Sequence, residues 1–118
     1  MPRGVRPRLA DIQDAVNGID SVTAGATYET HAATWGMQRA VERGLEIISE
    51  ASRHVPADLK ALAPDIPWRQ IAAIGNLLRH EYQRADPMAT WNIVREHLPG
   101  LAAATDRLMV EVKRRETG

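Results

Sequence analysis

The sequence contains no cysteine and no phenylalanine. Without cysteine, the chain can form neither disulfide bonds nor thiolate zinc sites, and it has no cysteine nucleophile. Without phenylalanine, its core must be built from Leu, Ile, Val, Ala and Met, which favours helices over sheets. No apolar run approaches the roughly 18 residues needed to span a bilayer, and the basic start lacks the apolar stretch of a secretory signal. These absences predict a cytoplasmic protein that does not enter a membrane.

An excess of charge of one sign is also absent, because fifteen basic and fifteen acidic residues cancel. Proteins that bind nucleic acid usually carry a positive excess. Neutrality does not exclude RNA as a substrate, but any RNA site must then come from a local basic cluster or from a groove between two subunits. The length of 118 residues suits a single domain over residues 1–118, and the 44% hydrophobic content is normal for a globular core.

Apolar residues recur with helical spacing along the chain, and no segment alternates in the manner of a strand. Residues 1–7 hold two Pro and one Gly and are expected to form a ragged terminus. The pattern predicts helices over residues 8–23, from 27 or 30 to 54, 57–62, 67–83, 87–98 and 101–115. The architecture expected from this pattern is an all-α, up-and-down helical bundle of four to five helices.

Several single residues refine this prediction. Thr27 or Thr30 could cap the second helix, and Trp35 belongs to its apolar stripe. Gly44 in the same helix could permit close helix packing. Pro99-Gly100 is expected to interrupt the chain between the last two helices.

The stretch from Ile66 to Leu101, IPWRQIAAIGNLLRHEYQRADPMATWNIVREHLPGL, carries the most informative chemistry. On a helical wheel, a buried face is expected to hold Ile71, Ile74, Gly75 and Leu78. Arg69, Asn76 and His80 share the opposite face. A solvated helix face is the simpler interpretation of these polar residues, and the stretch as a whole is needed to favour a functional one.

This stretch resembles the signature region of HepT-like proteins, the HEPN-type ribonucleases of bacterial toxin–antitoxin pairs. The matching elements, in order, are Ile66-Pro67-Trp68-Arg69, Asn76, His80-Glu81-Tyr82, Trp91 and Leu98-Pro99. The segment Leu45 to Val55 resembles the family's preceding helix, and the resemblance covers roughly residues 8–110. It implies a HEPN-like bundle that cleaves RNA without a metal ion, as a homodimer, in a type VII-like toxin–antitoxin system.

The sequence departs from this family at one important position. HEPN ribonucleases carry an Arg, then four to six arbitrary residues, then a His. The family's Arg corresponds to Gly75, and the alternative spacings fall on Ile74 and Ala73. Arg79, one helical turn after Gly75, could supply the missing guanidinium, or it could form a surface salt bridge. The alternative is a catalytically inactive HEPN-fold protein that binds a nucleotide or a partner.

The resemblance implies roles for the remaining site residues. His80 would be the general acid and base, and Arg79 with Asn76 would bind the phosphate. Arg69 and Arg84 would add positive charge for RNA binding in the groove of the dimer. Tyr82 would accept AMP from an MntA-type nucleotidyltransferase antitoxin, although it also falls on the buried stripe and could be a core residue.

No other pattern indicates a different function. His31, His54, His80 and His97 have no metal-ligand spacing, and the chain has no glycine-rich phosphate loop. We therefore expect no metal and no cofactor. A plain helical adaptor without any role in RNA cleavage is the third interpretation.

Overall fold

A computed structural model describes residues 4–80 and 86–117, except for the side chains of Arg79 and His80. This part of the chain contains helices and no strand. The helices are α1 (Val5–Thr23), α2 (Tyr28–Ala33), α3 (Trp35–Ser52), α4 (Ala57–Lys60), α5 (Trp68–His80) and α6 (Pro87–Thr117). The predicted all-α class is confirmed.

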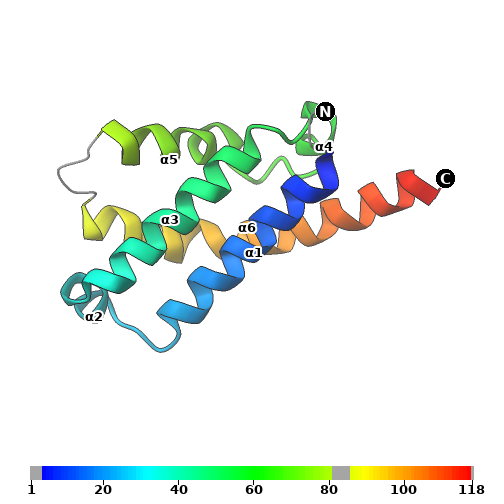
Figure 1. Ribbon diagram of the computed structural model, residues 1–118. Helices are drawn as coiled ribbons and strands as arrows, with labels where there is room; N and C mark the ends of the chain where they lie inside the picture. Colours follow the sequence, from blue (N-terminus) through cyan, green and yellow to red (C-terminus); the bar gives the residue numbers. More distant parts are fainter. Residues whose placement is uncertain (1–3, 81–85, 118) are drawn as a thin grey trace.

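The four long helices alternate in direction along the chain, as expected of an up-and-down bundle (Figure 1). α1 packs against α3 on one side and α6 on the other, and α3 packs against α5. α2 fills one end of the bundle between α3 and α6. The core consists of fully buried aliphatic side chains from the long helices: Leu9, Ile12, Val16, Ile19, Val41, Leu45, Ile48, Ile71, Leu101 and Leu108. Among the described residues, none of the helices is both long and apolar enough to cross a bilayer.

Gly44 allows α1 and α3 to approach closely, as the sequence predicted. A Cβ atom at this position would lie 2.7 Å from both Cγ1 and Cδ1 of Ile19, well inside van der Waals contact. Gly25 has a φ of 70° and follows the end of α1, where a left-handed conformation favours glycine.

The second predicted helix is in fact two helices. Thr27 caps α2, since its Oγ1 accepts a hydrogen bond from the Thr30 amide at 3.2 Å. Thr34 then adopts an extended conformation, and α3 begins at Trp35. The break turns the first residue of α3 outward, so the prediction that Trp35 belongs to the apolar stripe is wrong: 71% of its surface is exposed.

The break predicted at Pro99-Gly100 is also wrong, because α6 continues through both residues to Thr117. Proline removes one helical hydrogen bond, which normally ends or kinks a helix. Here Leu98 and Leu101 on either side are buried, and the Pro99 ring itself is exposed. Burial of the flanking leucines stabilises the helix and offsets the lost hydrogen bond. α1 also begins three residues earlier than predicted, at Val5.

His31 joins α2 to the start of α6 in the interior. Its ring is fully buried, with Nε2 3.3 Å from the Thr90 hydroxyl and the Trp91 ring 5.2 Å away, centroid to centroid. Nδ1 has no hydrogen-bond partner. Burial lowers the pKa of His31 below its ordinary value, and the Glu42 carboxylate and the Pro87 carbonyl offset this only in part.

This burial predicts a loss of stability in mild acid. The unfolded chain takes up a proton at His31 near pH 6.5, whereas the folded chain does so only at lower pH. Unfolding therefore consumes a proton below pH 6.5, and the free energy of unfolding should fall as the pH decreases from there. Urea titrations between pH 7.5 and 5 should show a steeper loss for the wild type than for His31→Gln. Equal slopes for His31→Gln and the wild type would contradict this assignment.

Candidate functional site

Trp68, the first residue of α5, holds the start of this helix against the bundle. Ile66 is buried, and the half-buried Trp68 packs on the core. The indole Nε1 of Trp68 donates a hydrogen bond of 3.1 Å to the Ala63 carbonyl, and the Lys60 ammonium lies 5.7 Å from its ring centroid. These contacts give Trp68 of the signature a structural role.

α3 holds the middle of α5 through hydrogen bonds to its backbone. The buried Ser49 hydroxyl donates to the Ala72 carbonyl at 2.8 Å and accepts from the Gly75 amide at 2.9 Å. Arg53 donates to the same carbonyl from Nε and Nη2, at 3.3 and 3.1 Å. Side-chain bonds from one helix to the backbone of its neighbour fix both the height and the rotation of α5. We therefore identify Ser49 as a positioning residue, which the sequence did not reveal.

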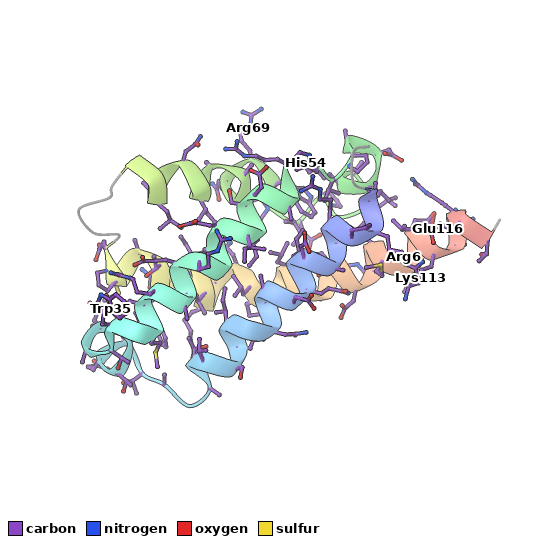
Figure 2. The ribbon with its side chains drawn as sticks, viewed as in Figure 1. Arg6, Trp35, His54, Arg69, Lys113 and Glu116 are labelled. Carbon is purple, nitrogen blue, oxygen red and sulfur yellow. The ribbon has the colours of Figure 1, made fainter. Side chains whose placement is uncertain are left out.

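This rotation places the predicted faces of α5 as the helical wheel indicated. Ile71, Ile74 and Gly75 are buried against the bundle. Arg69 and Asn76 are exposed on the other side, and Figure 2 shows Arg69 pointing away from the bundle. The predicted division between a buried and a polar face is confirmed for these residues.

The remaining predicted site residues cannot be placed in the same way. The backbone of Arg79 and His80 forms the end of α5, but their side chains lie outside the described part of the structure. Tyr82 and Arg84 lie in residues 81–85, which are also outside it. The roles assigned to these four residues stay predictions.

Gly75, the position of the family's motif Arg, lies on the α3 side of α5. It is buried, and its amide bonds to Ser49, whereas the next residue, Asn76, is exposed. A side chain at position 75 would start from this buried side. Asn76 is therefore open to solvent, whereas position 75, where the resemblance leads us to expect an arginine, is not.

An open groove of about 610 Å³ runs between α5 and α6. Its lining is mainly aliphatic, and the polar side chains in it are Gln70, Asn76 and His97. The full lining consists of Gln70, Ile71, Ala73, Ile74, Asn76, Leu77, Ile93 and His97. Leu77 is half exposed in this groove, although large apolar side chains are normally buried. The groove therefore places Asn76, from the predicted polar face of α5, beside apolar side chains of α5 and α6.

His97 is a site candidate that the sequence reasoning missed. It lies on α6, is half-buried and lines the groove together with Asn76. In the sequence it was considered only as a metal ligand. The available signal was its spacing of four residues from Ile93, which places both on one side of α6 beside the buried stripe of Val94 and Leu98. Within residues 4–80 and 86–117, no cluster of His, Cys, Asp or Glu could hold a metal ion.

Comparison with known proteins gives a consistent result. A family model described as "Ribonuclease HepT-like" matches residues 12–108. The chain is 37% identical to "Probable ribonuclease HepT" of Thermococcus cleftensis over 108 residues, which cover 92% of this chain and 98% of that protein. It is 34% identical to "Putative RNase MJ1380" of Methanocaldococcus jannaschii over 97 residues, covering 82% and 89% respectively. No solved structure matches the chain.

Proposed function

The chain belongs to the HepT-like ribonuclease family, and from this premise we propose that it is a metal-independent endoribonuclease. The observation that carries the proposal is the match over residues 12–108, which includes the whole of α5 with Asn76 on the groove. The site is centred on His80 at the end of this helix. The substrate is RNA.

The proposed reaction uses the RNA itself as the nucleophile. His80 takes the proton of a ribose 2′-hydroxyl, whose oxygen attacks the adjacent phosphorus while the 5′-oxygen of the next nucleotide leaves. An imidazole then returns a proton to the leaving oxygen. Arg79 and Asn76 bind the phosphate, whose negative charge grows in the transition state. Arg69 and Arg84 hold the flanking strand by charge.

One His80 serves two proton transfers poorly, and we propose that a homodimer supplies two. The mainly aliphatic groove beside Asn76 and the half-exposed Leu77 support this arrangement, since such surfaces favour contact with a second protein chain. A two-fold axis near α5 would bring both copies of its polar face to one cleft. The arginines of both chains would then form a local positive cluster, although each chain has a net charge of zero.

We further propose that the protein is the toxin of a cytoplasmic, type VII-like toxin–antitoxin pair. Its partner is an MntA-type nucleotidyltransferase antitoxin, which transfers AMP from ATP to the Tyr82 hydroxyl, so that a phosphodiester bond forms and pyrophosphate leaves. The added phosphate brings bulk and negative charge beside His80, so it repels the RNA backbone.

The second candidate function is partner or nucleotide binding without catalysis. The specific observation that favours it is Gly75, which replaces the motif Arg and is buried against α3. In that case the groove and α5 would bind a ligand, and RNA would not be cleaved. Arg79→Ala tests the substitute arginine within the first candidate, because cleavage at the wild-type rate would show that this arginine does not replace the missing one.

The test is cleavage of RNA by the purified protein in EDTA, before and after coexpression with its nucleotidyltransferase. We expect cleavage by the unmodified protein, and its loss when mass spectrometry shows AMP on Tyr82. Tyr82→Phe should cleave RNA at close to the wild-type rate and resist inactivation by the partner. Stable binding of the partner without any cleavage of RNA would favour the second candidate instead.

A further inference from the structure

Trp35 is unusually exposed for its size, at 71% of its surface. It begins α3 at one end of the bundle (Figure 2). The Arg39 guanidinium lies over its ring, 5.5 Å from the centroid. The same guanidinium is 2.7 Å from the Glu42 carboxylate, which holds the arginine in place and partly neutralises it. The protein thus presents a large aromatic ring, supported from one side and open to solvent.

The direction of Trp35 follows from the turns of α3. It precedes Arg53 by 18 residues, about five complete turns at 3.6 residues a turn, so the two side chains leave the helix on the same side. Arg53 binds the Ala72 carbonyl of α5. Trp35 therefore leaves α3 on the side that α5 covers near Arg53, but it lies at the opposite end of α3, where α5 has diverged from that helix (Figure 1).

The contacts between α3 and α5 also give a distance. Ser49 on α3 lies opposite Gly75 on α5, and beyond this contact the two helices diverge toward the end of α5 (Figure 1). Trp35 precedes Ser49 by 14 residues, or about 21 Å along α3 at 1.5 Å per residue. A single strand of several nucleotides is needed to connect the end of α5 with Trp35.

We propose that Trp35, supported by Arg39, is a stacking site for an unpaired base of the RNA strand whose phosphate lies at the end of α5. This inference rests on the proposed function and names a second contact with the same substrate. Base stacking on an aromatic ring needs one open face and tolerates any base. A protein-docking surface would need a contiguous apolar patch, whereas the contact described for the Trp35 ring is with the charged Arg39, and its neighbours in the sequence are the exposed Thr34 and Gly36. The local chemistry favours a base.

The test uses a fluorescein-labelled 12-nucleotide oligoadenylate with 2′-O-methyl groups, which the proposed reaction cannot cleave. Fluorescence anisotropy should show that Trp35→Ala weakens binding by about tenfold or more, while Trp35→Phe stays within about threefold of the wild type. A two-nucleotide probe should be bound equally by all three proteins because it is too short to reach. Val110→Ala, which truncates a side chain of similar exposure on α6, should not change the affinity.

The salt dependence of RNA binding distinguishes an effect of charge from an effect of base stacking. Stacking on Trp35 should leave the slope of log affinity against log salt unchanged in Trp35→Ala, because no phosphate contact is lost. Equal affinity of Trp35→Ala and wild type for the long probe would overturn the proposal. Unchanged RNA binding with a shifted sedimentation coefficient would also overturn it and assign Trp35 to a contact between protein chains.

The same experiment separates this proposal from the nuclease proposal. Tight, Trp35-dependent binding of the probe without cleavage of ordinary RNA would refute the nuclease and leave the stacking site standing. Cleavage of ordinary RNA together with probe binding that does not depend on Trp35 would support the nuclease and refute the stacking site. Failure of the wild type to bind the long probe would overturn the stacking site.

Discussion

His80→Ala should lower the rate of RNA cleavage by about 10²–10⁴-fold, the usual contribution of a general acid or base. The substitution removes the imidazole at the end of α5 and leaves the backbone contacts between Ser49 and the middle of the helix intact. The rate constant should fall much more than the affinity for RNA, because proton transfer occurs only in the reaction step. Single-turnover cleavage of a labelled RNA in EDTA measures both quantities.

The other histidines provide matched controls for this experiment. His54→Ala removes an exposed imidazole that pairs with Glu50 on α3, and it should cleave RNA at the wild-type rate. His97→Ala tests the imidazole that shares the groove with Asn76. A large loss in His97→Ala together with normal cleavage by His80→Ala would assign the proton transfer to α6 and contradict our proposal. An unfolded variant would be recognised by its circular dichroism before any rate was compared.

Gly44→Leu should lower the free energy of unfolding by about 3 kcal/mol, the largest effect on stability that we predict. Even the first added carbon would lie 2.7 Å from Cγ1 and Cδ1 of Ile19. Cδ1 could move by rotation of the side chain, but Cγ1 is closer to the backbone and buried between the helices. α1 and α3 would therefore have to separate, which would open the centre of the core. Urea denaturation followed by circular dichroism measures the loss.

Gly18→Leu is the matched control, since Gly18 is a helical glycine on α1, the neighbour of α3. It is exposed, and a Cβ there would meet no atom within 4 Å. Leucine has a higher helix propensity than glycine, so this variant should gain about 0.5–1 kcal/mol. Comparable stability of the two leucine variants would mean that α1 and α3 do not approach as closely as the structure indicates.

The sequence predicted the long helices and the faces of α5 because their apolar spacing is strong and regular. Ile71, Ile74 and Asn76 lie where the helical wheel placed them. Local signals failed where distant contacts decide the outcome. Pro99 is a strong helix breaker in isolation, yet the burial of Leu98 and Leu101 keeps α6 continuous.

The site was predictable only in part, for the same physical reason. Helical spacing placed Asn76 on the exposed face of its helix, and the resemblance to HepT-like proteins gave it a proposed role, but the bonds from Ser49 to α5 depend on how two helices are aligned, which no short pattern encodes. The exposure of Trp35 follows from the break at Thr34 and from the divergence of α5 from α3, so its apolar character alone suggested the opposite. His97 reaches the groove from a different helix and had no partner in the linear pattern.

The packing of α1 beside α6 has a practical consequence. Arg6 and Glu116 form an ion pair at 3.2 Å although 110 positions separate them, and both lie at the end of the bundle away from α2 and Trp35 (Figures 1 and 2). A short linker could therefore join the two ends of the polypeptide, and a circular permutant could be opened at an exposed turn. Affinity tags or fluorescent fusions at either terminus would leave the opposite end of the molecule free for ligand.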